Sequence, residues 1–384
     1  MKLLHLIPSL NPDYGGVVST VLLSTVELNA MGHETEILTL DTPDSFWLKE
    51  VQTKVYALGP ALGTFGYSAR LVPWLKAHAH EYDALIVNGL WQYVGFAAWR
   101  ALKDSSTPYF VFTHGMLDPW FKYFYPLKHL KKWLYWPWAE YRVLRDARRV
   151  IFTCEEERLL ARESFWLYCA KEAMVPLGVP VPPADDEKFT TLFLATYPEL
   201  QGKRILLFLS RIHEKKGCDL LLEAFAMVAH HHDDRLHLVV AGPDQAGWVK
   251  KLQSRAATLG IASRITWPGM LKDDMKWGAF YAAEVFCLPS HHENFGIVVV
   301  EALACGKPVL ISNKVQIWHE IVKDGAGLVD DDTLEGMQRL LNRWLSMSSA
   351  DFSIMETNTL LCFQKRFQVQ CATERLLELI EDSK

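Results

Sequence analysis

Two carboxylates, Glu293 and Glu301, stand eight positions apart in the segment SHHENFGIVVVEALACGKPV, residues 290–309. On one continuous helix, eight steps turn the second side chain about 80° away from the first, so the pair would not share a face. We therefore expect Glu293 on a loop at a strand end, a helix that opens near residues 294–296, Glu301 inside that helix, and Gly306 at its end. Such a helix start suits a phosphate, and nearby acidic side chains suit sugar hydroxyls. The combination indicates a nucleotide-sugar site.

From residue 293 the chain reads ENFGIVVVEALACGKPV, which resembles the signature of the retaining glycosyltransferases of family 4. Those enzymes have the two-domain GT-B fold. The resemblance implies that Glu293 binds the donor sugar and that Glu301 binds the ribose. It also implies a set of residues lying against the donor: Asn294, Phe295, Gly296 and Ile297. The alternative is two glutamates that flank an ordinary βαβ helix; the spacing alone fits that interpretation, but the surrounding residues do not.

A basic loop, SRIHEKKG at residues 210–217, directly follows a predicted strand. By the resemblance, Arg211 and Lys216 neutralise the donor diphosphate, with Lys215 as a weaker choice. A nucleoside diphosphate leaving group gains negative charge that fixed cations stabilise. Arginine supplies a planar fork and lysine a point charge, so no metal is required. The alternative is a basic loop of no special function, which is common at strand ends.

Three further positions follow predicted strands. Gly15 and Gly16 precede a helix, which lets a ligand approach the backbone closely. They form no dinucleotide fingerprint, because Gly-x-Gly-x-x-Gly is absent. The resemblance implies that this loop contacts the donor phosphate or the acceptor, that His114 hydrogen-bonds the transferred sugar, and that the nucleobase lies near Met270. Asp118 is a less certain contributor on the acceptor side. An ordinary turn and a structural histidine are the alternatives.

Histidines gather at two places, residues 230–232 and 291–292. Consecutive side chains point in different directions and cannot all chelate one ion, and nothing resembles His-Glu-x-x-His. We interpret the first group as a solvated helix end and the second as loop shaping beside the donor. No metal and no cofactor other than the donor substrate are expected.

The elements that position these residues alternate between strand and helix, which predicts parallel sheets covered on both faces. The first half has a strand at 2–8, a helix at 17–31, and strands at 33–40, 84–89, 109–115 and 149–154, the last closing its core. The pattern restarts with strands at 204–211, 236–242, 264–269, 285–290, 307–312 and 326–330, and helices at 218–231 and 248–260. Ligands of such sheets bind beyond the carboxyl ends of the strands, where each motif falls.

A length of 384 residues suggests two α/β domains. A proline-rich acidic stretch at 175–189 predicts the crossing between them. We expect an acceptor-side Rossmann-like domain at 1–178 and a nucleotide-sugar-binding Rossmann-like domain at 179–365. The two doubly wound domains would face each other across a cleft. A helix within 366–384 is expected to return and cover the first domain, as it does in the fold that the chain resembles.

Residues 120–149 hold eight Lys or Arg against two acids, about +6 in a chain whose net charge is −5, and ten aromatic residues. Cations interleaved with Trp and Tyr are typical of a membrane interface, and anionic lipids attract them. The alternative is a helical hairpin that packs its aromatics inward and leaves its lysines in water. Nucleic acid is not an expected partner, because the chain is acidic and shows no binding motif.

No apolar run approaches the ~20 residues that cross a bilayer. Residues 1–7 are interpreted as a strand rather than a signal peptide, and the odd cysteine count without Cys-x-x-Cys fits a reduced compartment. We expect a cytoplasmic protein that is peripheral on the inner face of the membrane.

The resemblance implies a retaining, metal-independent glycosyltransferase with a nucleoside-diphosphate sugar as donor and a lipid-linked or oligosaccharide acceptor, in polysaccharide or glycolipid synthesis. Two alternatives stay open. A sugar-nucleotide epimerase of the same fold would need a set of acids in the cleft, and no clear set is found. A nucleotide-sugar-binding protein without turnover would not need all of the residues predicted above.

Overall fold

A computed structural model describes residues 1–124, 126–229, 234–244 and 247–383. The chain divides into two compact units, Met1–Pro180 with Gln368–Lys384, and Val181–Phe367. The domain limits expected from the sequence, after residues 178 and 365, fall two residues before these divisions. The predicted solvated helix end at 230–232 lies outside the described residues.

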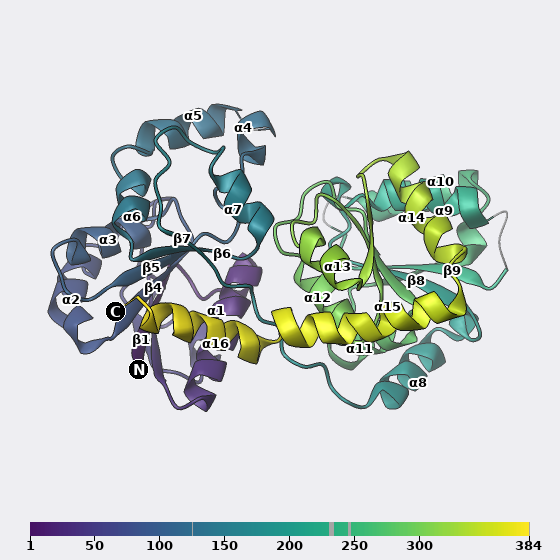
Figure 1. Ribbon diagram of the computed structural model, residues 1–384, viewed down its shortest axis with the longest axis horizontal. Coiled ribbons are helices and arrows are strands. Elements are labelled where there is room, and N and C mark those ends of the chain that lie inside the picture. Colours follow the sequence, from purple (N-terminus) through teal and green to yellow (C-terminus); the bar gives the residue numbers. More distant parts are fainter. Residues whose placement is uncertain (125, 230–233, 245–246, 384) are drawn as a thin grey trace. The chain divides into compact units, whose positions relative to one another are not determined.

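The first unit is built on a seven-stranded parallel sheet of order β3-β2-β1-β4-β5-β6-β7 (Figure 1). Its strands read as nearly continuous apolar runs because both faces are covered. They are β1 (Lys2–Ile7), β2 (Glu34–Thr39), β3 (Val55–Ala57), β4 (Ala84–Asn88), β5 (Tyr109–Phe112), β6 (Arg149–Phe152) and β7 (Glu172–Met174). The prediction that residues 149–154 close this core was wrong, since β7 pairs with β6 beyond them. The edge strands β3 and β7 have three residues each, too few to show a periodicity.

Helices cover both faces of this sheet. One face packs against α1 (Gly16–Ala30) and α16 (Val369–Glu381), whose Leu376 and Ile380 share a buried cluster with Phe110 of β5. The last helix, α16, thus belongs to the first unit (Figure 1). The other face is covered by α2 (Leu71–His78), α3 (Tyr93–Leu102), α6 (Glu140–Asp146) and α7 (Glu155–Ala161). Two more helices, α4 (Trp120–Phe124) and α5 (Pro126–Tyr135), lie between β5 and α6 in the chain.

The second unit contains a six-stranded parallel sheet of order β10-β9-β8-β11-β12-β13. Its strands are β8 (Arg204–Leu209), β9 (Leu236–Ala241), β10 (Ile265–Gly269), β11 (Val285–Leu288), β12 (Val309–Ser312) and β13 (Gly327–Asp330). Its helices are α8 (Asp186–Thr196), α9 (Cys218–Ala229), α10 (Trp248–Thr258), α11 (Asp273–Ala282), α12 (Ile297–Ala304), α13 (Trp318–Asp324), α14 (Leu334–Leu345) and α15 (Ser349–Cys362).

Both sheets have the same topology: the first three strands are added toward one edge, and the later strands are added toward the other edge. Such a reversal leaves a crevice beyond the carboxyl ends of the two central strands, where ligands of doubly wound folds bind. In the first unit the crevice lies beyond β1 and β4, and in the second beyond β8 and β11. None of the helices in the described ranges combines the length and apolar character that crossing a bilayer requires.

Candidate active site

In the second unit, the loops that leave β8 and β11 are held tightly together at the crevice. The 3-10 turn Glu214–Lys216 ends at Gly217, whose φ of 66° is left-handed. A Cβ on Gly217 would lie 2.0 Å from the carbonyl oxygen of Pro289, so only glycine fits there. The backbone N–H of His291 donates to the Lys215 carbonyl at 2.8 Å, which joins the two loops a second time. The basic loop and the glutamate segment are therefore one structural site.

Lys216 and Glu293, predicted from separate motifs, meet in this site as an ion pair between Nζ and Oε2. Lys216 is 9% exposed, and the Glu293 backbone is fixed by a bridge to Val315. A charge buried without a partner is costly, and the pair avoids that cost on both sides. The site thus holds a cation and a carboxylate ready to exchange partners when a charged ligand enters.

Two more cations stand beside Lys216. Arg211 is exposed on the loop after β8, and Lys215 is half-buried. Burial, together with the nearby Arg211 and Lys216 charges, lowers the pKa of Lys215. Like charges gathered at a crevice raise one another's energy, and a bound anion relieves this repulsion. The loop therefore has the electrostatics of a polyanion site.

The glutamate segment folds as its spacing predicted. Gly296, with φ of 73°, caps α12 without any side-chain hydrogen bond, so the first backbone N–H groups of the helix keep their positive end uncapped. Phe295 is buried edge-on against Phe367, which fixes the turn. Gly306 has the left-handed φ of 73° just beyond the helix end, as expected.

Glu301 projects from α12 toward α11, where Lys276 Nζ lies 2.9 Å from its Oε1. Lys276 was missed by sequence analysis, because nothing in its own helix marks it; only the fold brings it to Glu301. The same ammonium lies 4.1 Å from the ring centre of Trp277. Gly269 ends β10, and the adjoining Met270 is exposed, so the chain offers an open surface at the expected nucleobase position.

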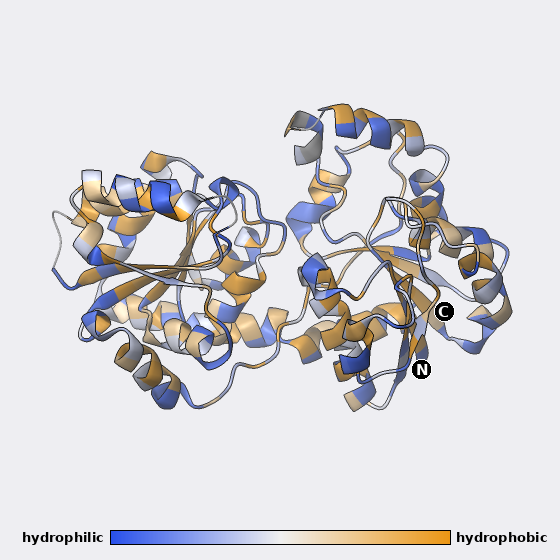
Figure 2. Ribbon diagram, turned by 180° about the vertical axis from the view of Figure 1, so that it is seen from behind, coloured by the Kyte–Doolittle hydropathy of each residue, from blue (hydrophilic) through white to orange (hydrophobic). Residues whose placement is uncertain are grey.

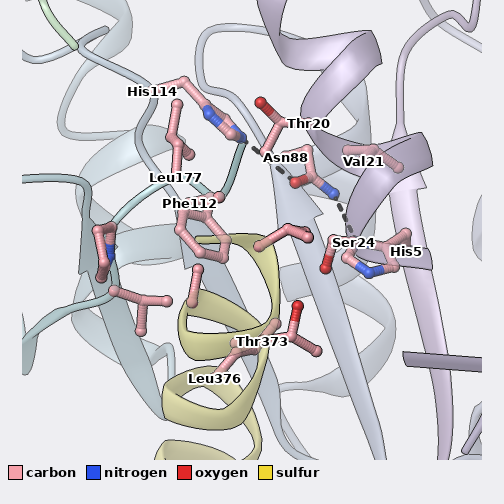
Figure 3. Close-up of a pocket in the computed structure, with 15 residues that line it drawn as sticks. His5, Thr20, Val21, Ser24, Asn88, Phe112, His114, Leu177, Thr373 and Leu376 are labelled. Atoms are coloured by element: carbon pink, nitrogen blue, oxygen red, sulfur yellow. Dashed lines mark hydrogen bonds between the residues drawn. The ribbon is translucent and has the colours of Figure 1, made fainter. Parts of the chain in front are cut away.

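In the first unit, His114 occupies the loop after β5 with a left-handed φ of 48°. Its Nε2 lies 3.3 Å from Asn88 Oδ1, and Asn88 Nδ2 lies 3.2 Å from His5 Nδ1 (Figure 3). The three side chains come from the carboxyl-end regions of β5, β4 and β1. They line a cavity of about 30 Å³, room for a water molecule or two. In the described part of the chain, His5 Nε2 has no hydrogen-bond partner.

The strained His114 loop is clamped by Glu157 of α7, a residue that sequence analysis also missed. Its carboxylate accepts hydrogen bonds from the N–H of Gly115 at 2.6 Å and from Thr113 Oγ1. The other oxygen accepts from the N–H and the hydroxyl of Thr153 at 2.7 and 2.6 Å. These bonds offset the cost of the left-handed backbone at His114.

The remaining predicted positions take simpler roles in the structure. Asp118 is buried and accepts from the N–H of Trp120 at 2.7 Å, which starts α4. Gly15 caps α1 and Gly16 is its first residue; both are exposed, and Gly15 has a φ of 72° with open space where a Cβ would stand. His291 pairs with Asp332 at 3.0 Å. Among the residues that the structure describes, no three His, Cys, Asp or Glu side chains gather closely enough to hold a metal ion.

Burial lowers the pKa of His5 to about 4. Burial, and to a smaller extent the nearby His5, lowers the pKa of His114 to about 4 as well. At neutral pH His114 is therefore a neutral hydrogen-bonding group rather than a cation. The unfolded chain takes up these protons near pH 6.5, above the folded pKa, so the first unit should lose stability as pH falls from 6.5 toward 4.

Thermal unfolding midpoints across this pH range check the expectation. A His5→Gln variant cannot take up the proton and should show a shallower decline than the parent. Equal slopes for the two proteins would contradict it.

Residues 194–358 match the family model described as glycosyl transferases group 1, and residues 15–178 match that of the glycosyl transferase 4-like domain. The chain belongs to this glycosyltransferase family. One matched stretch lies in each unit. The match in the first unit supports family membership there, where the sequence motifs are short.

Curated members of the family are similar to parts of this glycosyltransferase chain. Phosphatidyl-myo-inositol mannosyltransferase of Mycobacterium leprae is 37% identical over 39% of this chain and 37% of its own length. D-inositol 3-phosphate glycosyltransferase of Mycolicibacterium gilvum is 34% identical over 45% of this chain and 38% of its own. The matches thus span less than half the length of these relatives.

Solved structures share the whole GT-B fold. HepE of Anabaena, crystallised with UDP, has a TM-score of 0.77 at 18% identity, and the match covers 100% of both chains. WaaG, a glycosyltransferase involved in lipopolysaccharide biosynthesis, has a TM-score of 0.63 at 17% identity, covering 98% and 99%. At such identities the likeness establishes the fold of this glycosyltransferase and nothing finer.

Proposed function

We propose that this chain is a retaining, metal-independent glycosyltransferase that moves a sugar from a nucleoside-diphosphate sugar to a hydroxyl of a lipid-linked or oligosaccharide acceptor. The observation that carries the proposal is the Lys216–Glu293 ion pair, set among further cations at the uncapped start of α12. A diphosphate would take over the lysine, and the released carboxylate would turn to a sugar hydroxyl.

Each proposed role follows from the chemistry of the side chain. Arg211 and Lys216 stabilise the negative charge that develops on the departing diphosphate. Glu293 orients the sugar, and Glu301 accepts hydrogen bonds from the ribose hydroxyls. His114, neutral at physiological pH, hydrogen-bonds the transferred sugar. Gly15 and Gly16 let the donor or acceptor approach the backbone of the first unit.

The proposed chemistry needs no separate acid–base pair. In a same-face transfer, the bond from the sugar to the diphosphate breaks, the acceptor oxygen bonds to the sugar, and the leaving phosphate oxygen takes the acceptor's proton. The protein then acts by holding the two substrates and stabilising charge. Two relatives are named as a phosphatidyl-myo-inositol mannosyltransferase and a D-inositol 3-phosphate glycosyltransferase, and these names support a hydroxyl-bearing lipid or sugar acceptor. An anionic membrane met through residues 120–149 is the proposed partner surface.

Incubation with UDP-, GDP-, ADP- and dTDP-sugars, with and without a lipid extract, tests the proposal. Transfer requires that free nucleoside diphosphate is released with the extract and that mass spectrometry finds a glycosylated product. The UDP-bound HepE structures make UDP-sugars the first donors to try. Interconversion of free sugar nucleotides would instead indicate an epimerase, and binding without release a non-catalytic protein; either result would refute transfer.

Glu301→Ala should weaken binding of the bare nucleoside diphosphate by about tenfold or more, because hydrogen bonds to a charged acceptor contribute about 1.5–3 kcal/mol. Isothermal titration calorimetry measures this directly. Lys276→Met should have a smaller effect, since it releases Glu301 without removing it.

A matched control is Arg255→Ala, which breaks an ion pair with Glu223 on α9, outside the proposed site. Its nucleotide affinity should equal that of the parent. If Glu301→Ala also leaves the affinity unchanged, Glu301 has no role at the ribose.

A further inference from the structure

The helix α5 exposes its apolar face, whereas helices of globular proteins usually bury theirs. Leu127, Leu130 and Leu134 recur at the i, i+3, i+7 spacing of one helix face, and they are 83%, 55% and 64% exposed. On a helix that packs against a protein core, these leucines would face inward. Here they face away from the first unit, and Figure 2 shows hydrophobic and hydrophilic bands alternating along this segment.

The inward face of α5 carries the aromatic and polar side chains instead. His129 stacks on Phe165 at 4.8 Å, and Tyr135 packs edge-on against Phe65. Lys132 turns inward, with Nζ 4.5 Å from the ring centre of Trp91, and burial lowers its pKa to about 8. The alternative interpretation, a hairpin that packs its aromatics inward and leaves its lysines in water, is therefore wrong for Lys132. These inward contacts fix which face of α5 points outward.

The exposed apolar surface continues beyond the three leucines. Phe124 precedes α5 and Trp138 follows it, and both are exposed. Trp166 is exposed too, and its backbone carbonyl accepts a hydrogen bond from the indole N–H of Trp136 at 2.9 Å. We name the set the α5 face: Phe124, Leu127, Leu130, Trp133, Leu134, Trp138 and Trp166. Several large exposed apolar side chains on and around one helix mark an interaction site.

We propose that the α5 face docks the protein on the surface of an anionic lipid bilayer, with the leucines in the acyl boundary and Lys128 and Lys131 at the headgroups. Both lysines are exposed on α5; Lys131 lies next to the leucine row, and Lys128 lies farther around the helix. These side chains suit the layers of a bilayer surface. Leucines enter the acyl region, tryptophans prefer the interface, and lysines bind anionic headgroups. A protein groove would satisfy the leucines but gives no reason for the lysines beside them.

The link between membrane docking and the acceptor rests on the proposed function. A lipid-linked acceptor has its reacting hydroxyl at the headgroup layer, so docking would bring the first unit to it. Vesicle binding itself needs no donor, so the two proposals can fail separately.

Flotation of the full-length protein with phosphatidylcholine vesicles, with and without phosphatidylglycerol, tests the docking. The parent should float with the anionic vesicles, and more weakly as salt is raised. Leu127→Glu/Leu130→Glu should reduce partitioning by about tenfold or more, since two large apolar groups no longer enter the bilayer. Lys128→Glu/Lys131→Glu should lose about as much on anionic vesicles only. Lys132 is left intact because it packs inward.

Matched controls carry the same changes elsewhere. Ile354 and Leu361 are exposed on α15, so Ile354→Glu/Leu361→Glu replaces two exposed apolar side chains in the same way, and Lys250→Glu/Lys251→Glu reverses two exposed charges on α10. Both should float like the parent. Circular dichroism confirms that each variant is folded.

Several results would overturn the proposal. They are a parent that floats with no vesicles, a leucine variant that floats like the parent, or equal binding to neutral vesicles. A parent that self-associates in light scattering, with the leucine variant monomeric, would assign the α5 face to a second copy of the chain. If the protein binds the donor but does not float, only the docking proposal is refuted. If it floats but does not bind the donor, only the proposed function is refuted.

Discussion

Lys216→Ala is expected to slow sugar transfer by roughly 100-fold or more, the usual effect of removing one group that stabilises charge in the transition state. Lys216 is buried and already held in its ion pair with Glu293, whereas Arg211 is exposed on the same loop. Steady-state release of nucleoside diphosphate, with the donor and acceptor identified by the panel above, measures the loss. A variant within a few-fold of the parent would refute the assignment.

The substitution also leaves Glu293 without this partner, and an unpaired carboxylate that is only partly exposed destabilises the fold. A second variant separates the two effects. Lys216→Met/Glu293→Gln removes both charges and should recover much of the thermal stability lost in Lys216→Met, because no unpaired ion remains. It should recover none of the activity. If activity returned with stability, the pair would be a structural element only.

Lys215→Ala provides the neighbouring control. It removes a cation from the same turn, yet the backbone carbonyl of Lys215, which joins the two loops, is kept. We expect a smaller loss of activity than for Lys216→Ala. An equal loss would mean that net positive charge, rather than the position of Lys216, supports turnover.

Sequence patterns predicted the parts of this molecule whose signal is local. The ENFG turn, the helix that carries Glu301 and the glycine that ends it follow from spacing and from residue types with fixed backbone preferences. The alternation of strand and helix likewise predicted two parallel sheets, because each apolar run of four to six residues can be recognised as a strand on its own.

What the sequence did not reveal depends on contacts across the chain. Lys276 reaches Glu301 only because α11 packs beside α12, and no residue near position 276 signals it. The edge strands β3 and β7 are too short to carry a period. Around α5, the sequence indicated a basic and aromatic segment, but only the packing of His129 and Lys132 shows which face of the helix is outward.

Glu157→Ala should destabilise the first unit by roughly 3–5 kcal/mol, since it leaves buried donors without an acceptor at about 1–3 kcal/mol each. Glu157 is 1% exposed and accepts four hydrogen bonds, from Thr113, Gly115 and twice from Thr153. Partial repacking and entry of water keep the loss below the full sum. Hydrogen exchange in β5 and β6 reports it locally, which matters because a chain of two units need not unfold in one step.

The control lies two residues away on the same helix. Glu155→Ala breaks a partly exposed ion pair with Arg158, which should alter stability by less than about 1 kcal/mol. Where Glu157→Ala stays folded at low temperature, turnover should fall while affinity for the bare nucleoside diphosphate holds, because the His114 loop loses its clamp but the diphosphate site in the second unit is untouched. Exchange rates in β5 and β6 equal to those of Glu155→Ala would show that Glu157 holds neither the loop nor the fold.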